Sequence, residues 1–147
     1  MKPYLAAAAL SFAALPALAQ DRTPANPEAE VYFVTLEDGA TVSGPVTVAF
    51  GLKGMGVAPA GTLLEMTGHH HLLINRAPYG TLETDAEFFE FGIPGDENHI
   101  HFGGGQTETT LQLAPGTYTM QLLLGDVDHI PHDPVIASEV ITITVTE

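Results

Sequence analysis

The chain has 147 residues, with 18 acidic residues, 4 basic residues, 7 histidines and no cysteine. This length suits one domain of ordinary size. The formal net charge of −14 excludes electrostatic binding to nucleic acid, which needs clustered lysine and arginine, and it disfavours docking on an anionic membrane. The absence of cysteine excludes disulfides, thiolate nucleophiles and thiolate metal ligands.

The first residues predict a cleaved secretory signal peptide. Lys2 precedes an apolar run from Leu5 to Leu15, and an Ala-x-Ala site ends at Ala19. We therefore expect a signal peptide over residues 1–19, cleavage after Ala19 and export to the periplasm. The apolar run is too short to span a bilayer, and no cysteine is present to carry a lipid, so no membrane anchor is expected.

Residues 20–30 are polar and contain two prolines, which predicts a flexible leader. From residue 31 the sequence consists of short runs in which apolar and polar residues alternate. This period of two residues is typical of a strand with one buried face. The clearest runs are Val31–Leu36, Val46–Leu52, Thr110–Leu113, Tyr118–Leu124 and Ile141–Thr146.

Turn signals separate these runs, among them Asp38-Gly39, Gly44-Pro45 and Pro115-Gly116. Several short strands at this spacing favour an all-β fold, an immunoglobulin-like antiparallel β-sandwich that forms one domain over residues 31–147. Tyr118 stands where such sandwiches carry a tyrosine corner. No long segment has helical periodicity, and only Thr84–Phe89 could form a helical turn.

All seven histidines fall in three tight groups. The groups are His69 to His71, then His99 with His101, and finally His129 with His132. On a strand, His69 and His71 share one face, whereas His70 joins Leu72 and Ile74 on the other face. His99 and His101 also share a face, and the last pair lies in a loop that Pro131 and Pro134 stiffen.

Two strands that each present a histidine pair on a common face could bring imidazoles together at one ion. The predicted metal ligands are His69, His71, His99, His101, His129 and His132. His70 is the weakest candidate, since apolar residues share its face. Imidazole without thiolate suits copper or zinc, among other transition metals, and nearby carboxylates could orient each ring.

Four stretches resemble a small exported bacterial family catalogued as domain of unknown function 4399. They are Gly54–Gly61, Gly68–Asn75, Glu97–Thr109 and Leu122–Pro134, and the similarity extends from Val31 to Val145. The resemblance implies a periplasmic, sandwich-like domain and carries no assigned activity. The stretch Ala77–Pro94 is longer than the usual connection in that family, so a role of Phe88, Phe89 and Phe91 would be particular to this chain.

These observations predict a periplasmic domain that binds a transition metal, copper or zinc, for carriage, buffering or sensing. No catalytic residue is identified, and binding is favoured over catalysis. Two alternatives stay open. One is a metal-dependent enzyme of hydrolytic or redox type, and the other is a metal-free interaction module whose histidines are structural. The partner protein is not indicated by the sequence.

Overall fold

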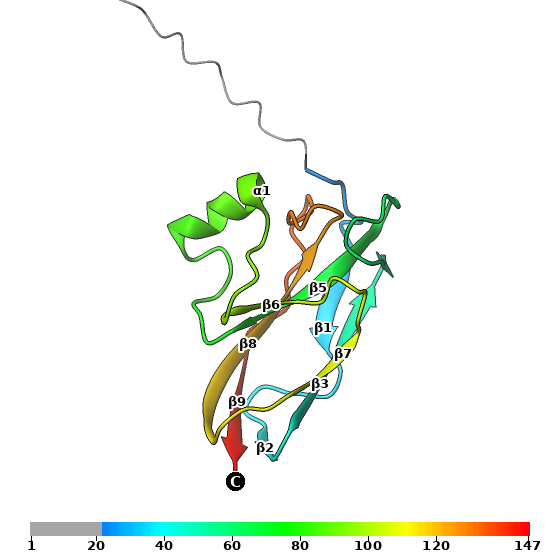
Figure 1. The fold of residues 1–147 in the computed structure, drawn as a ribbon. Helices are drawn as coiled ribbons and strands as arrows, with labels where there is room; N and C mark the ends of the chain where they lie inside the picture. The colour runs from blue at the N-terminus through cyan, green and yellow to red at the C-terminus, as the bar shows by residue number, and fades with distance from the viewer. Residues whose placement is uncertain (1–21) are drawn as a thin grey trace, which may run out of the picture.

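The computed structural model describes residues 22–147, and the predicted signal peptide lies outside this range. The described chain is an all-β protein (Figure 1). Its strands are β1 (Glu30–Phe33), β2 (Thr41–Ser43), β3 (Val46–Lys53), β4 (Gly56–Val57), β5 (Thr67–Ile74), β6 (His99–His101), β7 (Glu108–Leu111), β8 (Gly116–Gly125) and β9 (Ile141–Thr146). A short helical segment, η1 (Glu83–Glu87) followed by α1 (Phe88–Phe91), interrupts them. No helix among the described residues is long and apolar enough to cross a membrane.

The strands form two sheets. The smaller sheet has the order β1-β3-β7, and the larger has the order β2-β9-β8-β5-β4, with β6 also paired to β5. Most pairs are antiparallel, but β2 runs parallel to β9 and β4 runs parallel to β5. The hydroxyl of Tyr118 donates a hydrogen bond to the carbonyl of Ala114 (2.9 Å), the contact expected of a tyrosine corner.

The main core lies between the two sheets. Val46, Val48 and Phe50 point inward from β3, as their alternation predicts, and pack in one cluster with the buried residues of the larger sheet. Leu72 of β5 and Leu122 of β8 lie in this cluster and are fully buried.

A second, smaller core covers the opposite face of the larger sheet. Leu73 and Leu123 pack there against Phe88 and Ile93, which belong to the helical segment and its exit. Because this segment lies over the sheet (Figure 1), β5 is buried on both faces. Alternation alone placed Leu123 on the polar face of its strand, because nothing local in the sequence shows that a distant segment returns to cover it.

The described part of the predicted leader packs against the loop that follows β8. The amide of Ala25 donates to the carbonyl of Asp133 (2.8 Å), and the amide of Asp133 donates to the carbonyl of Thr23 (3.0 Å). Ala25 is buried, and the guanidinium of Arg22 donates to backbone carbonyls of the same loop. In the structure this segment therefore adds to the domain from residue 22 onward.

Candidate metal centre

Four histidines from three separate parts of the chain converge at one end of the larger sheet. His69 and His71 stand on one face of β5, and antiparallel pairing places His101 of β6 directly opposite His71. The fourth, His129, comes from the loop after β8. Gly125, the last residue of β8, pairs with His69. We call these four residues, His69, His71, His101 and His129, the histidine cluster.

The ring nitrogens of the cluster lie at short distances from one another. His69, His71 and His101 each offer one ligand atom, and these three atoms all lie within 4.8 Å of each other. Nε2 of His69 is 3.0 Å from Nε2 of His71, and Nε2 of His129 is 3.0 Å from Nε2 of His101. The six pairs of ring centroids are between 4.6 and 5.9 Å apart.

Two of these distances, His69 to His71 and His129 to His101, match those of nitrogens around a single ion. Two nitrogens bound at 2.0–2.1 Å to one metal stand about 2.9 Å apart at a right angle and about 3.3 Å apart at the tetrahedral angle. The observed Nε2 to Nε2 distances of 3.0 Å fall within that interval. The three ligand atoms of His69, His71 and His101 lie within 4.8 Å of one another, so the rings would have to close any wider spacing to coordinate a single ion.

Two glycines make room for the rings. A Cβ atom on Gly125 would stand 2.8 Å from Nε2 of His71, which is closer than real Cβ contacts allow. A Cβ atom on Gly103 would collide with the ring of His101. The absence of a side chain at these positions therefore lets the two rings occupy the space beside the backbone.

A hydrogen-bonded turn holds His129 in place. The carboxylate of Asp126 accepts hydrogen bonds from the backbone amides of Asp128 and Ile130 (2.9 Å each). The backbone amide of Asp126 donates to the carbonyl of Ile130 (2.9 Å). The hydroxyl of Thr23 donates to the same carboxylate at 2.5 Å. His129 itself has a left-handed backbone, with φ of 69°. Because the turn is fixed on several sides, it offsets the strain at that position.

The cluster favours uncharged imidazoles. Burial, assisted by neighbouring histidines, lowers the pKa of His69 to about 4 and that of His71 to about 2. Burial and the nearby His129 also lower the pKa of the His101 imidazole. Neutral imidazoles are the form that binds metal, so these rings are ready for an ion at neutral pH. His69 and His71 are buried, whereas His101 is exposed and opens the cluster to solvent.

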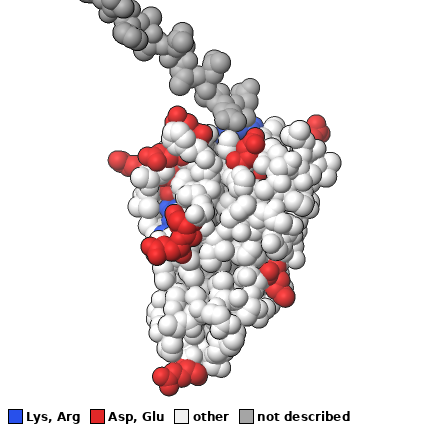
Figure 2. Space-filling view, in the orientation of Figure 1, with Lys and Arg blue, Asp and Glu red and all other residues white. Residues whose placement is uncertain are grey.

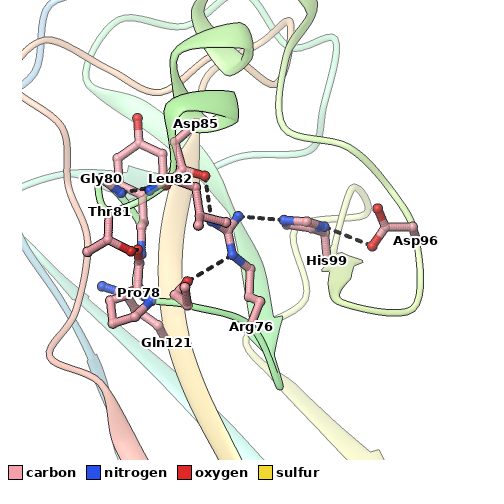
Figure 3. A network of polar contacts seen from close by, with 11 residues as sticks. Arg76, Pro78, Gly80, Thr81, Leu82, Asp85, Asp96, His99 and Gln121 are labelled. Atoms are coloured by element: carbon pink, nitrogen blue, oxygen red, sulfur yellow. Dashed lines mark hydrogen bonds and ion pairs between the residues drawn. The ribbon is translucent and has the colours of Figure 1, made fainter.

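His99, a predicted ligand, lies outside the cluster in a separate polar network (Figure 3). Its Nε2 is 2.7 Å from Nη1 of Arg76, and its Nδ1 is 2.8 Å from the carboxylate of Asp96. A guanidinium can only donate, so Nε2 must accept and Nδ1 donates to Asp96. Both ring nitrogens are therefore occupied, and His99 could bind metal only by giving up Arg76.

The remaining two histidines are also placed elsewhere. Nε2 of His132 donates to the carbonyl of Thr67 (3.1 Å), and the residue is fully buried. His70 points into the main core, as the strand alternation predicts, where its ring lies 5.2 Å from that of Phe50. The backbones of Gln106 and Gly51 lie near the His70 ring without reaching hydrogen-bond geometry, and burial outweighs their effect and lowers its pKa to about 4.

Sequence reasoning missed the roles of Arg76 and Asp85. Their buried ion pair anchors the network around His99, and Asp85 also accepts the amides of Gly80 (2.7 Å) and Leu82 (3.3 Å). Only the scarcity of basic residues in the sequence could have drawn attention to Arg76. The carboxylates expected to orient the ligands do so only for His99, and among the described residues none accepts a hydrogen bond from a ring of the cluster.

The comparison with protein families gives one match. The model described as Domain of unknown function (DUF4399) matches residues 48–146. The chain belongs to this family. The DUF4399 region runs from β3 to β9 and contains all seven histidines, so the whole cluster lies within it. No curated protein and no solved structure matches the chain.

Proposed function

We propose that this protein binds one transition-metal ion, copper or zinc, through the histidine cluster. The observation that carries the proposal is the convergence of three imidazole nitrogens within 4.8 Å, with a fourth ring in contact. The donor set contains only imidazole nitrogens, which suit these two metals. By the Irving–Williams order, copper(II) binds more tightly than zinc, so the ion found in the cell depends on metal supply as well as on affinity.

A role in carriage, buffering or sensing follows from the coordination number. If all four imidazoles bound the ion, they would close a tetrahedral site and leave no position for substrate, which favours binding alone. Acidic side chains gather on the face shown in Figure 2 at the end where α1 lies, and Glu83, Glu87 and Glu90 belong to that helical segment. Their negative charge raises the local concentration of cations near the site.

A metal-dependent enzyme is the second candidate, and a specific observation favours it. The tightest group contains three histidines, the ligand number of a catalytic zinc site, and the fourth comes from a loop. If His129 left the ion, water could occupy the fourth position and be activated there. The number of nitrogen ligands in the loaded protein separates this candidate from a closed binding site.

Two further expectations stand beside the metal proposal. We propose export to the periplasm, supported by the signal-peptide pattern of residues 1–19. We also propose an immunoglobulin-like sandwich, supported by the packing of two sheets around one core and by the Tyr118 corner. Fractionation of the native cells tests the location, and a crystal structure tests the strand arrangement.

The metal proposal is tested by thermal unfolding of protein that has been stripped with a chelator. Zinc or copper should raise the melting temperature, because an ion that binds only the folded state adds about 2.7 kcal/mol at 100 times its Kd. The double variant His69→Ala/His101→Ala should lose this gain, whereas His132→Asn, outside the cluster, should keep it. A melting temperature that no divalent ion changes would support the metal-free module instead.

A further inference from the structure

A hollow of about 410 Å³ lies between the helical segment and the adjoining ends of β5 and β6. Arg76 and His99 form one side of it, and Leu82, Phe88 and Phe91 form the other. Figure 3 places Arg76 and His99 beside the helical turn that carries Asp85. Pockets of a few hundred cubic ångströms with a mainly apolar lining and a few polar groups are the usual sites of small molecules.

Two large apolar side chains at this hollow are exposed. Phe91 has 74% of its surface exposed and Leu82 has 43%, although the neighbouring Phe88 is buried in the second core. Together Phe91 and Leu82 form exposed apolar surface at the hollow, and such a patch favours an apolar group as its occupant. The occupant should therefore have an apolar body.

The polar groups of the lining carry one charge of each sign. Arg76, whose side chain is 9% exposed, uses three of its five N–H donors on Ala77, His99 and Asp85, and the other two have no partner among the described residues. Glu87 is exposed, and among the described residues it makes no side-chain hydrogen bond or ion pair. The amide nitrogen of Asn98 donates to the carbonyls of Ile74 (2.8 Å) and Asn75 (3.4 Å), and its oxygen accepts no hydrogen bond among the described residues. The lining thus offers both donors for a carboxylate and acceptors for an ammonium group.

We propose that this hollow binds a free α-amino acid with an apolar side chain. The carboxylate accepts from the remaining N–H groups of Arg76, and the ammonium group donates to Glu87 and to the oxygen of Asn98. The apolar side chain packs on Phe91 and Leu82. The site is distinct from the histidine cluster and does not require a metal, so it stands independently of the metal proposal.

Calorimetry on the full, metal-free chain tests this assignment with four probes. L-Phenylalanine should bind saturably at one site. 3-Phenylpropionate lacks the ammonium group and 2-phenylethylamine lacks the carboxylate, so each should bind at least about tenfold more weakly, and glycine should give no saturable binding. The absence of saturable binding by L-phenylalanine, or equal binding of 3-phenylpropionate, would overturn the proposal.

Exposed residues provide variants that leave the buried ion pair intact. Glu87→Gln should weaken the binding of L-phenylalanine by about tenfold and leave the binding of 3-phenylpropionate unchanged, because only L-phenylalanine carries an ammonium group. Phe91→Ala should weaken both. Glu90→Gln, in the same helical segment but outside the lining, is the matched control and should change the binding of neither probe. If Glu90→Gln and Glu87→Gln have the same effect, a general loss of charge explains the result and the assignment fails.

Discussion

At the scale of single residues, one side-chain type serves three purposes in this protein. The imidazoles of His69 and His71 face other imidazoles, that of His99 links an arginine to an aspartate, and that of His70 lies among apolar groups. The sequence separates His70 from His69 and His71, because strand alternation fixes which face a residue takes. It could not separate His99 from His101, because Arg76 reaches His99 from outside the local stretch.

Acid should destabilise the metal-free protein. The pKa of His70 is about 4 in the fold and about 6.5 when unfolded, so between these values the unfolded chain holds a proton that the folded chain lacks. The contribution of His70 to the free energy of unfolding is therefore fully present above about pH 6.5. It falls by about 3 kcal/mol as the pH drops towards 4. The lowered pKa values of His69 and His71 add to this loss of stability in acid. Urea unfolding at pH 7 and pH 5 measures the loss.

The variant His70→Leu is the control for that prediction. Leucine removes two buried nitrogens whose nearest polar neighbours, the backbones of Gln106 and Gly51, lie outside hydrogen-bond geometry, so the variant should be about 1–2 kcal/mol more stable at pH 7. It should also lose less stability between pH 7 and pH 5 than the parent. An equal acid loss in both proteins would mean that His70 does not carry the effect.

At the scale of elements, the position of each strand decides which rings meet. β6 has only three residues, and its register against β5 sets His101 opposite His71 and His99 opposite Leu73. The polar network of His99 holds the start of this strand in place, because Arg76 lies two residues after the end of β5 and Asp96 lies three residues before His99. His99 and His101 therefore have different tasks although they lie two residues apart.

Alanine at these two positions should give opposite results. His99→Ala leaves the buried Arg76 without one acceptor and should lower the free energy of unfolding by about 1–3 kcal/mol while the chain still binds one metal ion. His101→Ala, at an exposed ring, should change the stability of the metal-free protein by less than about 0.5 kcal/mol and weaken metal binding by at least about tenfold. Denaturant unfolding and metal titration measure both quantities. Loss of metal in His99→Ala alone would reverse our assignment.

The end of β8 provides a second prediction at this scale. Gly125→Ala should push a methyl group against His71 and weaken metal binding by at least about tenfold, at a cost of about 1–3 kcal/mol in stability. Gly116→Ala is the matched control on the same strand, because its Cβ would meet nothing closer than 3.6 Å. Similar metal affinities for the two variants, measured by titration, would contradict the role given to Gly125.

The longer strands are predictable from the sequence, but the shortest ones are not. β3 and β9 alternate over six residues or more, so their buried faces follow from the pattern, whereas in β8 the pattern gives only the face that packs in the main core. β2 and β4 have three and two residues and pair in parallel, β2 with the distant β9 and β4 with the next strand β5, and runs this short carry no periodic signal. The packing of Phe88 on Leu73 and Leu123 is not predictable from local sequence either, because it is a contact between segments far apart in the chain.

At the scale of the whole molecule, the fold acts as a rigid support for the cluster. The main core fixes β5 from one side, and the second core fixes it from the other, so His69 and His71 cannot move apart without disrupting packed side chains. The loop with His129 is tied to the N-terminal segment through Thr23 and Asp126. Histidine grouping in the sequence indicated a site, but only the pairing of strands selects four rings of the six.

The most direct test is X-ray absorption spectroscopy of the protein loaded with zinc or copper, together with elemental analysis after dialysis. We predict one ion per chain, surrounded by three or four imidazole nitrogens at about 2.0 Å. A dialysed protein that retains no ion, or an ion surrounded by oxygen alone, would contradict the proposed role of the four histidines.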